Sequence, residues 1–146
     1  MIGFLRGRID TINQDSVVID VNGVGYEILV ANPEKFSLYQ DTHIYTYLKL
    51  SENDIALYGF LFKEEKELFL KLISVKGLGC KMALPILAVG SIDGIKDAIE
   101  RENILYIKKF PKIGDKLAKQ IILDLKGKLG VVATGNVVDT ESELYD

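Results

Sequence analysis

A short glycine-containing motif occurs twice in the second half of the chain. The first copy, GLGCK, covers residues 77–81, and the second, KIGDK, covers residues 112–116. Gly79 aligns with Gly114 at a spacing of 35 residues, and both copies have lysine two positions later. Each copy lies between segments in which apolar residues recur with helical spacing. A repeat at this spacing predicts two similar helix–turn–helix units that pack as a pair.

Each copy has the chemistry of an oxyanion site. The apolar residue, Leu78 or Ile113, is expected to anchor the turn. The following glycine has no Cβ, so we expect an unusual φ there and close approach of an anion. A helix then begins, and its first N–H groups lack internal partners and lie at the positive end of the helix dipole. The predicted phosphate-binding residues are Leu78, Gly79, Cys80, Lys81, Ile113, Gly114, Asp115 and Lys116, with the amides of Leu78, Gly79, Ile113 and Gly114 as donors and the two lysines as long-range attraction.

A nucleotide site and an ordinary helical turn are the alternatives for this motif. A Rossmann turn follows a strand and needs a third glycine, but here a helix precedes the turn and residues 80–82 are Cys-Lys-Met. Neither copy has the spacing of a Walker loop. A plain αα-hairpin with a glycine cap explains one copy equally well, whereas two matched copies favour the helix-hairpin-helix motif. That motif contacts the nucleic-acid backbone and reads no bases.

The charge distribution indicates a polyanionic partner for the same half of the chain. Residues 1–62 carry 4 Lys and Arg against 8 Asp and Glu, whereas residues 63–130 carry 14 against 9. Residues 131–146 carry none against 4, and the whole chain has a net charge of -3. An acidic first part joined to a basic second part places the expected contact with DNA in the second part.

The first sixty residues have the pattern of short strands. Five segments are rich in β-branched and aromatic residues and alternate in part: residues 4–9, 16–21, 24–30, 43–50 and 55–60. This pattern predicts a five-stranded β-barrel of the OB type. Asn22-Gly23 predicts a type I′ hairpin turn, and residues 51–54 predict a second tight connection. The fold class is therefore α+β, an OB-type barrel followed by an all-α domain with two helix-hairpin-helix motifs. We expect the barrel over residues 1–62, the helical domain over 63–130 and an acidic flexible linker over 131–146.

Besides the helix that begins after Gly79, helical elements are expected at four places in the second part. The pattern predicts helices over residues 63–76, 92–101, 104–110 and 115–129, with Ser91 and Asn103 as N-caps of the second and third.

The chain resembles the RuvA family, which binds Holliday junctions in the bacterial branch-migration machine. The resemblance rests on MIGFLRGRI, VNGVGYEI, DIALYGF, LISVKGLGCKMAL and FPKIGDKLAKQIILDLKGKL, in that order, and covers about residues 1–130. It implies a homotetramer, or an octamer on DNA, that holds a four-way junction open and planar for recombination and DNA repair. It also implies an acidic pin at the crossover, assigned to Glu52 and Asp54, although Asn53 separates these two acids where the family commonly has adjacent ones. Lys112 replaces the glycine usual at the start of the second hairpin.

The resemblance further implies partners. In the family a third, helical module contacts the hexameric ATPase motor RuvB, and the resolvase RuvC joins the wider complex. This chain ends where that module would begin, so we expect it to bind junctions but to couple poorly to RuvB. The resemblance implies a non-catalytic subunit of an ATP-dependent DNA helicase complex. The single cysteine and single histidine point to the cytoplasm and weigh against a metal site, so no cofactor or metal is expected. No apolar run approaches the roughly 20 residues needed to span a membrane, so no membrane contact is expected.

Cys80, His43, Arg6 and Arg8 are further candidates for catalysis or binding. A nucleophilic Cys80 would have only His43 as a partner, in the other half of the chain, so a tolerated small residue is favoured. Arg6 and Arg8 alternate with apolar residues and are expected on one face of the first strand, facing either DNA or solvent. A helix-hairpin-helix repair enzyme without clear catalytic residues and a protein-binding OB module are the alternative functions.

Overall fold

The structure is a computed structural model that describes residues 1–130. The predicted linker over residues 131–146 lies outside the described residues. The chain divides into two compact units, Met1–Phe69 and Leu70–Asp146, and each unit is described by itself. Within residues 1–130, no helix has the length and apolar character needed to cross a membrane.

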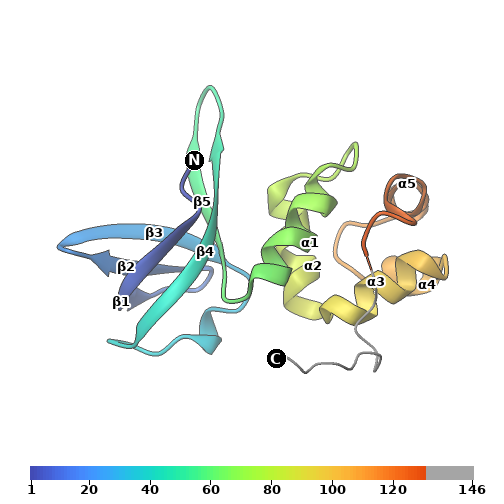
Figure 1. Ribbon diagram of the computed structural model, residues 1–146. Coiled ribbons are helices and arrows are strands. Elements are labelled where there is room, and N and C mark those ends of the chain that lie inside the picture. The colour runs from blue at the N-terminus through green and yellow to red at the C-terminus, as the bar shows by residue number, and fades with distance from the viewer. Residues whose placement is uncertain (131–146) are drawn as a thin grey trace. The chain divides into compact units, whose positions relative to one another are not determined.

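The first unit is a closed five-stranded barrel, as predicted, with the strand order β1-β2-β3-β5-β4 (Figure 1). Neighbouring strands are antiparallel except for β3 and β5, which are parallel. The strands are β1 (Phe4–Ile12), β2 (Ser16–Val21), β3 (Val24–Val30), β4 (Asp41–Leu50) and β5 (Ile55–Phe60), and a short 3-10 helix, η1 (Pro33–Lys35), precedes β4.

The barrel forms because alternate residues of each strand point inward. The buried core residues are Ile9, Val17, Ile19, Ile28, Val30, Phe36 and Ile44. The turn between β2 and β3 has positive φ at both central residues, 54° at Asn22 and 88° at Gly23, which confirms the predicted hairpin.

An aromatic cluster covers part of the outer surface of the barrel. Helix α1 (Lys63–Ile73) follows β5 directly, and its Phe69 is fully buried. The Phe69 ring lies 4.8, 5.5 and 5.9 Å from the rings of Phe60, Tyr58 and Tyr47. This packing places the first part of α1 in the barrel unit, whereas the sequence pattern changes at residue 63.

The second unit contains the remaining helices. They are α2 (Cys80–Val89), α3 (Ile92–Glu100), α4 (Ile104–Ile107) and α5 (Asp115–Leu125). The two predicted N-caps are confirmed: Ser91 Oγ accepts a hydrogen bond from Gly94 N–H at 3.0 Å, and Asn103 Oδ1 accepts one from Tyr106 N–H at 3.2 Å.

All four predicted helices end earlier than the sequence predicts: α1 and α4 by three residues, α5 by four and α3 by one. After Ile107, the last residue of α4, the hydrogen bonds change to the spacing of a 3-10 helix. The N–H groups of Lys109 and Phe110 each donate to the carbonyl three residues earlier, at 3.2 Å. Pro111 follows, and a residue before proline is disfavoured in a helix. Helix α5 ends at Leu125, before the predicted end at residue 129, because Gly127 takes a φ of 81°.

Candidate nucleic-acid interface

The two glycine motifs fold into the same turn. Leu78 and Ile113 are 3% and 5% exposed, so both side chains anchor the turn in the core as predicted. The Leu78 amide donates to the Val75 carbonyl at 3.1 Å, and the Ile113 amide donates to the Phe110 carbonyl at 3.3 Å. These two amides already have partners inside the turn. They are therefore poorer candidates for phosphate contact than the amides that follow them.

The left-handed backbone of each turn lies at the first residue of the motif. Gly77 has a φ of 92° and Lys112 a φ of 65°. Gly79 and Gly114 instead have φ, ψ of −94°, 177° and −95°, −174°, which is extended backbone that any residue can adopt. The expectation of an unusual φ at the second glycine is therefore wrong. The left-handed residue lies two positions before each of these glycines, at Gly77 and Lys112. At Lys112 this conformation is energetically unfavourable, because it is strained for any L-amino acid with a side chain.

No packing inside the protein requires the second glycine. A Cβ built on Gly79 or on Gly114 would meet no protein atom within 4 Å. The φ values do not require glycine either. The space that a side chain would fill lies outside the protein, directly in front of a helix N-terminus, where a group from another molecule can approach.

The helix N-termini at these two glycines have unpaired amides. Gly79 is the N-cap of α2 and Gly114 the N-cap of α5, and neither cap has a side-chain hydrogen bond. Within residues 1–130, no hydrogen bond is donated by the N–H groups of Gly79, Lys81, Gly114 or Lys116. Such amides, at the positive end of a helix dipole, form a binding position for a phosphate oxygen.

The two turns lie against each other and share an open groove. A Cβ on Gly77 would lie 3.6 Å from Leu117 Cδ1, so the first turn packs against the second helix of the repeat. The groove has a volume of about 640 Å³ and is lined by Lys76, Gly77, Gly114, Asp115, Lys116, Leu117 and Gln120. One surface therefore joins residues that are far apart in sequence.

Lysines surround this surface, and one carboxylate is partly neutralised. Lys81 and Lys116 are exposed. Asp115, the first residue of α5, pairs with Lys108 at 2.8 Å. The hydrogen bond from Lys108, followed by its charge, holds the pKa of Asp115 below its usual value. Asp115 thus carries a negative charge at neutral pH that Lys108 offsets.

The second tight turn of the barrel unit is confirmed and carries the predicted acids. Ser51 N–H donates to the Asp54 carbonyl at 2.9 Å, and Asp54 N–H donates back at 3.4 Å. Glu52 and Asp54 are exposed at the tip. Figure 1 shows that the β4–β5 hairpin reaches beyond the other strands of the barrel.

Family models match both units of the chain. The RuvA N terminal domain matches residues 1–59, and the SAM-like helix-hairpin-helix tandem matches residues 69–127. A protein of Pediococcus pentosaceus is 50% identical over 131 residues, which cover 90% of this chain and 67% of the relative. The chain belongs to the RuvA family. Further RuvA relatives are from a Geobacillus strain, 46% identical with 95% of this chain and 70% of the relative covered, and from Oenococcus oeni, 43% identical with 100% and 78% covered. All three relatives carry the name Holliday junction branch migration complex subunit RuvA.

Cys80 and His43, the two candidates for catalysis, are packed against other residues of this RuvA-family chain. The Cys80 side chain is 5% exposed, so its thiol does not face the phosphate position although its backbone lies in the turn. The His43 ring stacks on Phe4 at 4.6 Å and lies 4.7 Å from the Tyr45 ring. Both residues are therefore packing residues of their own units.

The arginines of the first strand lie on the outer face of the barrel, as the alternation predicts. Arg6 is opposite His43 and Arg8 is opposite Asp41 in the β1–β4 register. Arg8 Nε lies 3.3 Å from Asp41 Oδ1, and the Arg6 guanidinium lies 5.6 Å from the centre of the Phe4 ring. Both arginines are exposed and partly engaged by neighbours.

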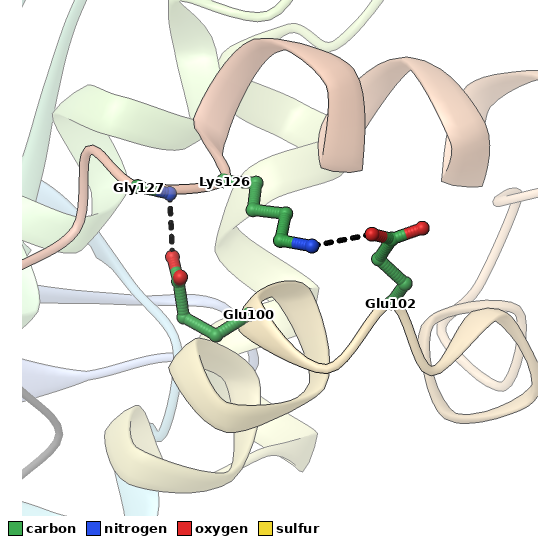
Figure 2. A network of polar contacts seen from close by, with 4 residues as sticks. All are labelled: Glu100, Glu102, Lys126 and Gly127. Carbon is green, nitrogen blue, oxygen red and sulfur yellow. Dashed lines mark hydrogen bonds and ion pairs between the residues drawn. The ribbon is translucent and has the colours of Figure 1, made fainter.

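A polar network that the sequence pattern did not reveal holds the end of α5 (Figure 2). Glu100 accepts a hydrogen bond from Gly127 N–H at 2.7 Å, and Lys126 forms an ion pair with Glu102. The hydrogen bond with Glu102, followed by its charge, raises the pKa of Lys126 above its usual value. The network ties the C-terminal end of α5 to Glu100, the last residue of α3, and to Glu102 in the turn that follows.

Proposed function

We propose that this protein binds four-way DNA junctions through the sugar–phosphate backbone, without sequence preference. The observation that carries the proposal is the pair of helix N-termini at Gly79 and Gly114. Both expose unpaired amides beside an uncovered glycine in the same backbone conformation. The family relatives, named as subunits of a Holliday junction branch migration complex, support the same function.

Each hairpin contributes to binding in two ways. The amides of Gly79 and Lys81 in one turn, and of Gly114 and Lys116 in the other, donate to phosphate oxygens. The two lysine side chains add attraction over a longer distance. The two turns share one surface and contact the DNA backbone at two places. They therefore fix the position of a duplex arm without reading its bases.

The proposed assembly is a homotetramer, or an octamer on DNA, with one duplex arm for each subunit of a tetramer. The hairpin tip with Glu52 and Asp54 is proposed as an acidic pin at the crossover. Carboxylates repel phosphates, so a pin of this kind keeps the exchanging strands apart and does not tighten binding. The proposed partners are the RuvB motor, which supplies ATP-driven movement, and the RuvC resolvase, in the cytoplasm.

A gel shift with a four-way junction and a linear duplex of the same length tests the binding function. We expect preference for the junction and an affinity that falls steeply with salt. The slope of log affinity against log salt is about −0.9 per neutralised phosphate. Equal affinity for both DNAs, or no dependence on salt, would contradict the proposal. Sizing of the protein without DNA tests the tetramer.

A matched pair of charge reversals locates the contact. Lys116→Glu, in the second hairpin, is expected to weaken junction binding and to make the salt slope shallower. Lys35→Glu makes the same change of charge at an exposed position of η1 in the barrel unit, and it is expected to leave the slope unchanged. Equal losses in the two variants would show that net charge alone, and not the hairpin, determines binding.

A neutral tip tests the pin. Glu52→Gln with Asp54→Asn removes two exposed carboxylates and keeps the size of both side chains. We expect unchanged or tighter junction binding with reduced preference for the four-way form. Collapse of binding in this variant would show that the two acids support the structure and do not repel DNA.

A further inference from the structure

The β4–β5 hairpin carries an uncovered apolar pair directly behind its acidic tip. Leu50 and Ile55 are partners in the strand register and are 57% and 70% exposed. Leu48 and Leu57, the next pair on the same face, are partly buried, and Leu57 packs against the barrel core. The inward apolar face of the barrel therefore continues along the hairpin beyond the part that the barrel covers.

The tip holds this pair at a defined place. Besides the two backbone hydrogen bonds between Ser51 and Asp54, Ser51 Oγ donates to the Asp54 carbonyl at 3.1 Å. The turn is therefore closed immediately after Leu50 and before Ile55. Two large apolar side chains exposed together on a projecting hairpin are typical of a surface that a partner covers.

The charges next to the pair restrict what that partner is. Glu52 lies two residues after Leu50 and Asp54 one residue before Ile55, and both are exposed. The same tip of a second copy would bring like charges together, and a phosphate would also be repelled. The faces of nucleobases are uncharged and apolar. A tip of this composition can therefore approach DNA only where phosphates are apart and base pairs are opened.

We propose that Leu50 and Ile55 form an apolar wedge that contacts unstacked base pairs at the crossover of the junction. Apolar side chains inserted at a base step are known to unstack it and to offset part of the unstacking cost. The carboxylates ahead of the wedge keep phosphates away, and the wedge covers the exposed base faces. This inference rests on the proposed junction binding and adds residues that contact bases without reading their sequence.

The test uses a four-way junction with 2-aminopurine in a base pair next to the crossover, since the fluorescence of this base rises when it is unstacked. The wedge variant is Leu50→Ser with Ile55→Ser. The matched control is Val24→Ser with Leu38→Ser, which removes two apolar side chains of similar exposure, 53% and 54%, from elsewhere on the barrel unit. Ile55→Thr, which keeps a β-branched residue in the strand, guards against loss of the hairpin.

The wild-type protein and the control are expected to raise the fluorescence on binding. The wedge variant is expected to bind within about threefold of the wild type, because phosphate contacts dominate affinity, and to lose most of the fluorescence rise. Ile55→Thr should lose part of it.

An undiminished rise in both wedge variants would overturn the inference. Dissociation of the free wedge variant into smaller species, with the control intact, would also overturn it, since the pair would then be a contact between copies. If the wild type shows no preference for the junction in the gel shift, the proposed function fails and the wedge fails with it. A normal gel shift with no fluorescence rise in the wild type overturns the wedge alone.

Discussion

Replacing Gly114 by alanine separates folding from binding in this protein. The residue has a φ of −95° and a ψ of −174°, and a methyl group there would meet no protein atom within 4 Å. Alanine at a compatible glycine position stabilises by about 0.4–1 kcal/mol through the unfolded chain. Alanine is, however, a poorer N-cap than glycine by a similar amount. The two effects oppose each other, so we expect the free energy of unfolding to change by less than about 1 kcal/mol.

Under the proposed binding, the same methyl group would add bulk at the N-cap of α5, next to the amides that bind phosphate. A phosphate oxygen that hydrogen-bonds to these amides would be displaced, and a hydrogen bond to a charged group contributes about 1.5–3 kcal/mol. The expected loss is therefore roughly 10- to 100-fold in junction affinity per site. Fluorescence anisotropy with a labelled four-way junction at fixed salt measures the affinity, and urea denaturation measures the stability.

Two other glycines provide controls. Gly3 is also open, with no atom within 4 Å of an added Cβ, so Gly3→Ala should change neither stability nor affinity. Gly77 has a φ of 92°, so Gly77→Ala should lower stability by about 1 kcal/mol or more. Wild-type affinity of Gly114→Ala would refute the reasoning, and so would a loss of affinity that merely follows a loss of folding.

Four further predictions concern stability. Gly59→Ala should destabilise by about 1–3 kcal/mol in urea denaturation, since its Cβ would lie 2.4 and 2.7 Å from two isoleucine side chains of the barrel core. His43→Phe should stabilise by about 1 kcal/mol, because it keeps the ring stack and removes a buried Nε2 that has no hydrogen-bond partner among the described residues; a lower denaturation midpoint would contradict this. Lys112→Gly should stabilise by about 1 kcal/mol, because glycine takes the left-handed φ of 65° without strain. An unchanged denaturation midpoint would show that the turn is not strained. The same change removes a positive charge and should make the salt slope of junction binding shallower. Lys108 lowers the pKa of Asp115 below its ordinary value of 3.8. The stability difference between wild type and Lys108→Ala should therefore be fully present above pH 3.8 and should vanish as the pH falls through the lowered pKa. A difference that persists in acid would show another cause.

Features that depend on neighbouring residues were predictable from the sequence. The alternation of β2, β3 and β5 predicts these strands with the bounds that the structure has. Asn22-Gly23 predicts the hairpin turn, because both positions need positive φ. Ser91 and Asn103 predict helix starts, because a side-chain oxygen three residues before an N–H can cap it. The repeat predicts two similar turns with buried Leu78 and Ile113.

The tertiary structure decided what depends on residues distant in sequence. It showed that Gly77 and Lys112 take the left-handed conformation, whereas Gly79 and Gly114 are extended and uncovered. Whether space beside a glycine is empty depends on what packs there, and a sequence pattern carries no such information. The contacts of Lys126 with Glu102 and of Gly127 with Glu100, at the end of α3, likewise cannot be predicted from a local pattern.

The amino-acid sequence alone therefore determined the five strands, the paired hairpins and the acidic tip, since turn chemistry and apolar periodicity act over a few residues. Only the folded chain decided which amides remain unpaired, which apolar side chains stay exposed behind the tip and where the two turns share one groove. Those properties depend on packing between segments that are far apart in the sequence.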